Sequence, residues 1–231
     1  MLDGEMVLDS TAVLLVWEVP NYPQYYIPIG DISDSVLRAT SEIRRSPSRG
    51  DAHVFDVLGR KSSIQGGAWH HPDSPLTDIK DHVRFDWQTM DAWFEEDEEV
   101  YVHPRDPYTR IDVLDSSRHI RIEINGETVA DSSNAKLLFE TGLPTRYYLP
   151  KTDVRFDLLS ATDKSTGCPY KGTARYWTVS AGGILHENVA WGYDTPLPES
   201  RGIEGRVAFY NEKVDIFVDG DLLERPTTQF S

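Results

Sequence analysis

The sequence contains one cysteine, Cys168, and this is the side chain with the clearest potential for chemistry. It begins the string Cys168-Pro-Tyr-Lys-Gly172, whose turn-forming residues predict a loop between two strands. Lys171 would place a positive charge near the sulfur, which favours a nucleophilic thiolate. The alternative is a small packed side chain, because free cysteine is among the most buried residue types. Cys168 and Lys171 are therefore candidate catalytic residues.

Glu140 and His186 are the candidates for moving protons to or from the thiol. Glu140 ends an apolar segment, and a half-buried carboxyl group is suited to general acid or base chemistry. It could equally be a structural partner of Arg146 or of a backbone N–H group. His186 has the side chain that most often serves as the base for a thiol, although a single histidine is more often a surface or packing residue.

Aromatic residues are dense in the same region and predict a ligand pocket. A tandem Tyr-Tyr pair on a strand points to opposite faces, so one ring enters the core and the other does not. An aromatic cleft closed by Lys171 and Arg146 would suit a small planar or anionic ligand. Core packing is the alternative for each ring. The candidate ligand-binding residues are Arg146, Tyr147, Tyr148, Tyr170, Tyr176 and Trp191.

These residues belong to the second of two similar halves of the chain. With an offset of 122 residues, Met1–Trp69 aligns with Glu123–Trp191 without a gap, and more than a quarter of the aligned pairs are identical. Such self-similarity indicates two copies of one folding unit. The first copy has Ser46 where the second has Cys168, and Ile64 where the second has His186. Only the second copy therefore carries the thiol and this histidine.

The local patterns are those of short antiparallel strands with little helix. Residues 119–124 alternate apolar with polar, and Asn125-Gly126 is a preferred hairpin turn. Further strands are expected at 136–140, 146–149, 174–179, 206–210 and 213–218, whereas 155–159 fits either a strand or a brief helix. We predict an all-β protein with a first domain at residues 1–94, an ordered acidic and Pro-containing connector at 95–117, and a second domain at 118–231.

Composition narrows the functional class. The 23 basic and 38 acidic residues give a net charge of −15, which disfavours nucleic acid and anionic membrane surfaces as partners. No stretch is long and apolar enough to span a membrane, no signal peptide is evident, and one cysteine excludes an internal disulfide. We expect a cytoplasmic protein. No metal or cofactor is expected, because one thiol cannot build a zinc knuckle and adjacent His70-His71 would point apart.

The second half resembles a known family. Its strings Leu138–Pro150 and Cys168–Ala174, with Tyr176-Trp177, Ala190-Trp191 and Val207–Phe209, are similar to the family called domain of unknown function 427. The first half resembles a diverged second copy. The resemblance implies two tandem β-tent domains of folded-over antiparallel sheets. The family has also been labelled nucleotidyltransferase, but this sequence has no Gly-rich phosphate cradle and no paired aspartates for two metals.

Three functional hypotheses follow from these observations. In the first, the second domain binds a small molecule in its aromatic pocket and acts on it through Cys168. In the second, the domain binds a small ligand or peptide without chemistry. In the third, the two copies form a monomeric structural pseudodimer. The accessibility of Cys168 and its distance from a proton acceptor distinguish the first hypothesis from the others.

Overall fold

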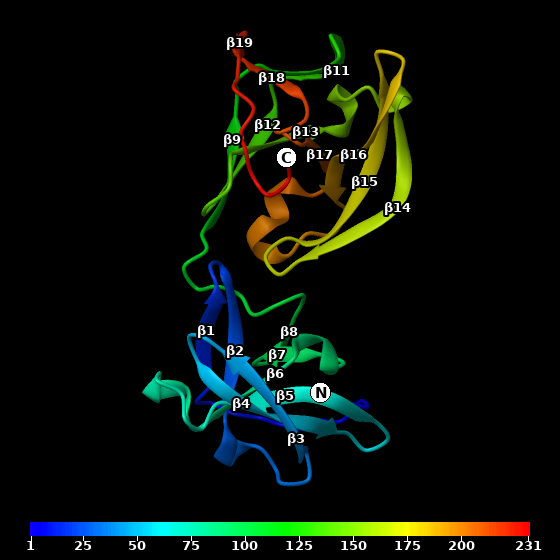
Figure 1. Ribbon diagram of the computed structural model, residues 1–231. Coiled ribbons are helices and arrows are strands. Elements are labelled where there is room, and N and C mark those ends of the chain that lie inside the picture. Colours follow the sequence, from blue (N-terminus) through cyan, green and yellow to red (C-terminus); the bar gives the residue numbers. More distant parts are fainter. The chain divides into compact units, whose positions relative to one another are not determined.

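The computed structural model describes residues 1–231, and almost all regular structure in it is antiparallel sheet (Figure 1). The chain divides into two compact units, residues 1–106 and 107–231. The prediction of an all-β protein with two domains is confirmed. The helical segments are short 3₁₀ turns, and none could span a membrane. They are η1 (Ile29–Asp31), η2 (Thr77–Ile79), η3 (Trp87–Thr89), η4 (Lys151–Asp153), η5 (Phe156–Leu158) and η6 (Pro198–Ile203).

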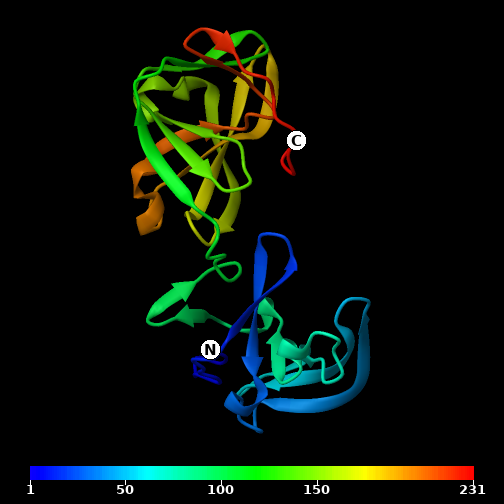
Figure 2. The ribbon, with the colours of Figure 1, turned by 90° about the vertical axis from the view of Figure 1, so that its left-hand side faces the viewer.

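The first unit contains one large sheet with the strand order β1-β2-β6-β5-β4-β3 and a small hairpin of β7 and β8. Strands β3 and β4 form a long curved hairpin, which is best seen in Figure 2. The strands are β1 (Leu14–Val19), β2 (Tyr22–Pro28), β3 (Leu37–Ser46), β4 (Gly50–Leu58), β5 (Ser63–His70), β6 (His82–Phe85), β7 (Trp93–Glu95) and β8 (Glu98–Val100).

The second unit contains a seven-stranded sheet of order β14-β15-β16-β17-β13-β12-β9 and a four-stranded sheet of order β11-β10-β18-β19. Strands β14 and β15 form the long curved hairpin of this unit (Figure 1). The strands are β9 (Ile111–Ser116), β10 (Ile120–Ile124), β11 (Glu127–Ser132), β12 (Ala135–Glu140), β13 (Arg146–Pro150), β14 (Leu159–Cys168), β15 (Gly172–Ala181), β16 (Ile184–Tyr193), β17 (Arg206–Phe209), β18 (Asp215–Val218) and β19 (Asp221–Leu222).

The two large sheets repeat the same order of strands. Strands β1 to β6 correspond to β12 to β17, and the order from β1 to β3 in the first sheet matches the order from β12 to β14 in the second. The second sheet has one more strand, β9, which pairs with β12. The residues expected to form a connector, 95–117, divide between the units: β8 pairs with β7, and β9 belongs to the second sheet.

Positive backbone angles explain why certain residues are identical in the two copies. Gly50 and Gly172 have φ angles of 81° and 89°, a region that only glycine enters without strain, and each closes the turn of a long hairpin. The predicted hairpin at Asn125-Gly126 is also present, because β10 and β11 pair at Ile124 and Glu127 on either side of it. Both turn residues have positive φ, as a type I′ turn requires.

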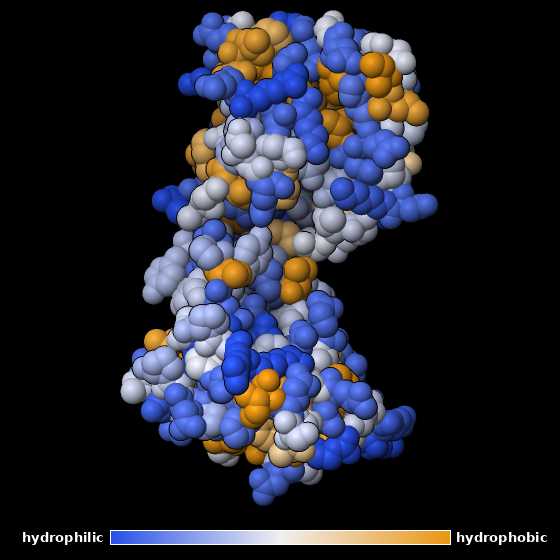
Figure 3. All heavy atoms as spheres, in the orientation of Figure 1, coloured by the Kyte–Doolittle hydropathy of each residue, from blue (hydrophilic) through white to orange (hydrophobic).

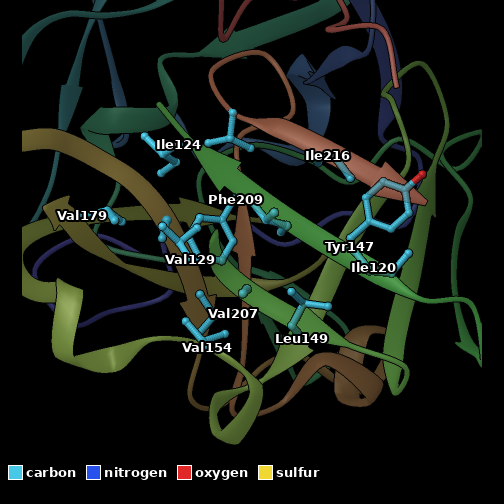
Figure 4. Close-up of a cluster of buried hydrophobic side chains, with 14 of the residues drawn as sticks. Ile120, Ile124, Val129, Tyr147, Leu149, Val154, Val179, Val207, Phe209 and Ile216 are labelled. Atoms are coloured by element: carbon cyan, nitrogen blue, oxygen red, sulfur yellow. The ribbon is translucent and has the colours of Figure 1, made fainter. Parts of the chain in front are cut away.

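The second unit has the larger cores. One cluster of 18 buried residues lies between its two sheets, and Figure 4 shows Tyr147, Leu149 and Phe209 among them. A second cluster of eight buried residues, including Tyr148 and Trp191, lies on the other face of the large sheet. The two adjacent tyrosines therefore point to opposite faces, as predicted. The expectation that only one of the rings enters a core is wrong, because each ring is buried in its own cluster. The first unit has one cluster, of ten buried residues.

Candidate functional site

Cys168 is the last residue of β14 and precedes the turn to β15, where it pairs with Gly172. The prediction placed it on a loop between strands, but it lies at a strand end instead. It is half-buried and is the one free thiol of the chain. In the first copy, Ser46 pairs with Gly50 in the same way. Because the copy without a thiol has this turn too, the turn alone accounts for the glycine of the Cys-Pro-Tyr-Lys-Gly motif.

Lys171 and Glu140 form an ion pair between the β14–β15 turn and the end of β12. Each side chain is about 10% exposed, so the pair is largely desolvated. The Lys171 ammonium is therefore held by a carboxylate of opposite charge, which offsets its effect on the Cys168 sulfur. Glu140 was predicted to pair with Arg146 or a backbone N–H group, or to act as an acid or base. Its partner is Lys171.

His186 lies away from the thiol. It pairs across the sheet with Val179, seven residues along β15 from the Gly172 that faces Cys168. At about 3.3 Å per residue, this is roughly 20 Å. The imidazole Nε2 accepts a hydrogen bond from the Asn125 amide at 3.2 Å. The prediction that His186 serves as a base for Cys168 is therefore wrong, because the two residues lie beside opposite ends of β15, on β14 and β16.

Arg146 anchors the face of the large sheet on which Tyr148 and Trp191 lie. Its guanidinium donates to both carboxylate oxygens of Glu212, each at 2.7 Å, and to Asn211 Oδ1 at 3.0 Å. Burial by itself raises the pKa of Glu212, but hydrogen bonds from Arg146 and Thr228 hold that pKa below its ordinary value. Arg146 is thus fully engaged inside the protein and presents no free charge to a ligand.

The remaining tyrosines and Trp191 mostly form a packed wall. Trp191 Nε1 donates to the Tyr148 hydroxyl at 3.1 Å, and burial raises the pKa of Tyr148. The Tyr176 hydroxyl is 2.8 Å from Thr166 Oγ1. The backbone carbonyl of Tyr170 accepts a hydrogen bond from Ser200. Tyr147 belongs to the core between the sheets and is excluded from any pocket by its position (Figure 4).

A pocket of about 320 Å³ lies in front of this wall. Its aromatic sides are Tyr210, which packs on Trp191 at a centroid distance of 4.5 Å, and Phe230, at 5.9 Å from Tyr210. Two causes raise the pKa of Tyr210: burial, which is the larger, and a hydrogen bond with Tyr176. The hydroxyl of Tyr210 therefore stays neutral. The lining residues are Lys164, Glu187, Asn188, Tyr210, Lys213, Gln229, Phe230 and Ser231.

Two ammonium groups lie beside aromatic rings at this pocket. Lys164 Nζ is 4.6 Å from the centre of the Tyr176 ring, and Lys213 Nζ is 5.4 Å from that of Tyr210. These distances are within the range of cation–π interactions. Two aromatic rings, two ammonium groups and one side-chain carboxylate, Glu187, therefore line the pocket, and Cys168 does not line it.

Comparison with protein families identifies both halves of the chain. The family model described as "Domain of unknown function (DUF427)" matches residues 1–96 and 112–220. The chain belongs to the DUF427 family. The two matched segments correspond to the two copies in the sequence and to the two units of the structure. The chain is therefore a tandem DUF427 protein. A search of curated proteins gives no match.

The pocket of the second DUF427 domain uses residues that sequence reasoning did not select. Tyr210 and Lys213 flank a turn between two predicted strands, and Phe230 lies in a C-terminal segment without a strand pattern. Glu212, the partner of Arg146, lies in the same turn as Lys213. The aromatic set itself was a useful signal, because Trp191 and Tyr176 form the wall behind the pocket. It could not indicate which rings reach the surface.

Proposed function

We propose that the second DUF427 domain binds a small organic anion in the pocket lined by Tyr210 and Phe230. The observation that carries this proposal is the pocket itself, in which two ammonium groups, Lys164 and Lys213, outnumber the one side-chain carboxylate, Glu187, beside two aromatic rings. A volume of about 320 Å³ is at the lower end of the range for small-molecule sites, about 300–1,000 Å³. Aromatic rings would contact a planar part of the ligand, and the ammonium groups would neutralise its charge.

Several observations favour binding over thiol chemistry. Cys168 does not line the pocket, Lys171 is paired with Glu140, and His186 lies beside the far end of β15. A thiol enzyme needs a nucleophile and a base that both reach one substrate. Binding without catalysis accordingly agrees best with the geometry.

A small ligand also agrees with the protein surface. Hydrophilic residues predominate on the face drawn in Figure 3, and apolar residues appear there in separate groups. Broad exposed apolar patches are the usual sign of a protein partner. A pocket of this size, lined by aromatic and charged side chains, is the feature that favours a small molecule.

The test is a titration calorimetry screen of the full chain against aromatic and aliphatic carboxylates and phosphate monoesters. We expect at least one compound to bind, and Lys164→Gln with Lys213→Gln to weaken it about tenfold or more, as lost hydrogen bonds to a charge do. Lys151→Gln is the matched control, because the Lys151 Nζ lies 5.8 Å from the Trp177 ring outside the pocket. Equal affinity in all variants would reject the pocket as the site.

A further inference from the structure

The first unit carries a polar version of a face that is apolar in the second unit. In the second unit, Tyr176, Trp191 and Ala208 pair across neighbouring strands and belong to a buried cluster. In the first unit, the corresponding row is Val54, Trp69 and Arg84. An arginine thus replaces the alanine. No buried apolar cluster forms on this face of the first sheet, although the strands are arranged in the same order.

Further basic residues surround Trp69 on this face. His71 is at the position of Tyr193 in the repeat, and Arg49 is at that of Lys171. The guanidinium carbon of Arg84 lies 4.1 Å from the centre of the Trp69 ring, and that of Arg44 lies 5.0 Å from it. We call this group the arginine platform. It consists of Arg44, Arg49, Trp69, His71 and Arg84.

Within the platform, Arg44 has its own carboxylate partner, Glu42 at 2.9 Å, but Arg49 and Arg84 share a single one. Glu18 serves two arginines, with contacts of 3.4 Å to Arg84 Nε and 3.8 Å to Arg49 Nη2. Close charge-assisted hydrogen bonds are about 2.7–2.9 Å long. Glu18 also accepts a hydrogen bond from the Tyr26 hydroxyl at 2.8 Å. In the second unit, by contrast, Arg146 is paired at 2.7 Å with the carboxylate of Glu212, which it shares with no other arginine. Arg49 and Arg84 are therefore only partly neutralised.

Buried nitrogen atoms of the platform lack hydrogen-bond partners. These atoms are Arg49 Nε, Arg84 Nε and His71 Nε2, and His71 is only 2% exposed. Asp86 is the other carboxylate whose charge acts on Arg84, but it accepts the Gln88 N–H at the start of η3. Buried donors without partners cost free energy, and the partner that satisfies arginine donors best is an oxyanion.

The platform is also a local exception in an acidic unit. Residues 1–106 contain nine basic and 20 acidic residues, yet two arginines lie over the Trp69 ring and a third, Arg49, shares Glu18 with one of them. The side chains of Arg44, Arg49 and Arg84 remain 45%, 22% and 13% exposed, so a solute can reach the edge of the group. Repulsion by the rest of the unit favours a small anion over an extended polyanion.

We propose that the first unit binds a small oxyanion, the phosphate or carboxylate group of a metabolite, between Arg49 and Arg84. The anion accepts hydrogen bonds from the guanidinium N–H groups at the exposed edge, including Arg49 Nη2, which Glu18 reaches only at 3.8 Å. The Trp69 ring and a hydrogen bond to Gln24 Oε1 at 3.1 Å fix the orientation of Arg84. This site is separate from the pocket of the second unit and does not depend on the function proposed for that pocket.

The direct test observes the arginine side chains by NMR spectroscopy of the full wild-type chain. Addition of inorganic phosphate or of acetate should shift the Nε–H resonances of Arg49 and Arg84 in a saturable way. Those of Arg38 and Arg60, which already contact Asp56 and Glu5, should not shift. The titrant that saturates at the lower concentration identifies the preferred oxyanion. The absence of a saturable shift, or equal shifts at all four arginines, would overturn the proposal.

A calorimetric comparison tests the same site with variants. Arg49→Met with Arg84→Met should weaken binding of the titrant about tenfold or more. Arg38→Met with Arg60→Met removes the same number of charges and should leave the affinity unchanged. If circular dichroism shows that the first double variant is unfolded, Arg84→Lys replaces it. Lysine keeps the positive charge but lacks the planar, forked guanidinium group of arginine. Unchanged affinity in the platform variants would contradict the proposal. The Lys164 and Lys213 variants should still show the NMR shifts.

Discussion

The two units share one strand order but differ in how one face of the large sheet is used. In the second unit this face is a buried apolar cluster, and its charges are matched one to one: Arg146 with Glu212 and Lys171 with Glu140. In the first unit the face is basic, and Glu18 alone serves two arginines at longer distances. The difference shows that a repeated fold does not preserve a repeated site. Features common to both copies, such as the hairpin turn at Gly50 and Gly172, are best explained by the fold.

Strand β9 is part of the reason for this difference. It extends the second sheet beyond β12, and its Ile111 and Val113 pack against the apolar cluster on that face together with η6. A Cβ atom at Gly202 of η6 would lie only 2.7 Å from Val113, so this packing is tight. The first sheet has no strand beyond β1, and the equivalent face stays partly open. Extra covering elements therefore separate the second unit's face from solvent.

The largest expected effect comes from breaking the best-matched charge pair. Arg146→Met should destabilise the second unit by about 3–5 kcal/mol, because it leaves the Glu212 carboxylate buried without its partner. At the equivalent position, Gln24→Met removes one hydrogen bond from Arg84 and should cost the first unit about 1 kcal/mol. Urea unfolding followed by the amide NMR signals of each unit measures both values. Similar losses in the two units would contradict the comparison.

A smaller effect is expected at the other pair. Lys171→Met leaves Glu140 without its only ion-pair partner and should cost about 2 kcal/mol, less than for a fully buried pair. Arg49→Met in the first unit leaves Glu18 in contact with Arg84 and Tyr26, and should cost less than about 1 kcal/mol. The same urea titrations apply. A greater loss for Arg49→Met would show that the platform is as well matched as its counterpart.

The units should respond to acid in different ranges of pH. Burial lowers the pKa of His71 from its ordinary 6.5, so the unfolded state binds a proton more readily, and the first unit loses stability as the pH falls below about 6.5. The pKa of Glu212 lies below its ordinary 4.5, so the contribution of that carboxylate to the second unit is complete above about 4.5 and disappears at lower pH.

Residue-resolved thermal unfolding between pH 7 and pH 4 measures this difference. His71→Tyr, which introduces the residue found at position 193 of the second copy, should flatten the response of the first unit between pH 6.5 and 5. A first unit whose stability does not change over this range would show that His71 gains no proton on unfolding.

The smallest expected effect concerns the thiol. Cys168→Ser introduces the residue that the first copy has at the equivalent position, Ser46, at a half-buried strand end. We expect a change in unfolding free energy within about 1 kcal/mol and no change in ligand affinity. A loss of several kcal/mol would show that the sulfur is a packing element that serine cannot replace.

The fold was predictable where residues alternate and turns have strict backbone requirements. The Asn125-Gly126 hairpin and the opposite faces of Tyr147 and Tyr148 were both predicted correctly. Strand β14 was missed because it is a largely exposed edge strand, whose polar sequence shows no buried face. Alignment of the two copies also identifies positions at which they differ, such as Ser46 and Cys168.

The site was less predictable because its partners are distant in the sequence. Arg146 and Glu212 are 66 residues apart, and nothing in the pattern of either segment selects the other. His186 and Cys168 occur together in the second copy, but strand register places them beside opposite ends of β15. Phe230 enters the pocket from a segment without regular structure. Such contacts depend on how strands pair and how the final segment packs.

The most direct test of the account compares ligand affinity in three proteins: the wild type, Cys168→Ala and Lys213→Gln. The ligand is the tightest binder from the panel of carboxylates and phosphate monoesters, and titration calorimetry measures its affinity. We predict that Cys168→Ala binds as the wild type does and that Lys213→Gln binds several-fold more weakly. Loss of binding in Cys168→Ala with unchanged binding in Lys213→Gln would contradict this prediction and would place the ligand at the thiol.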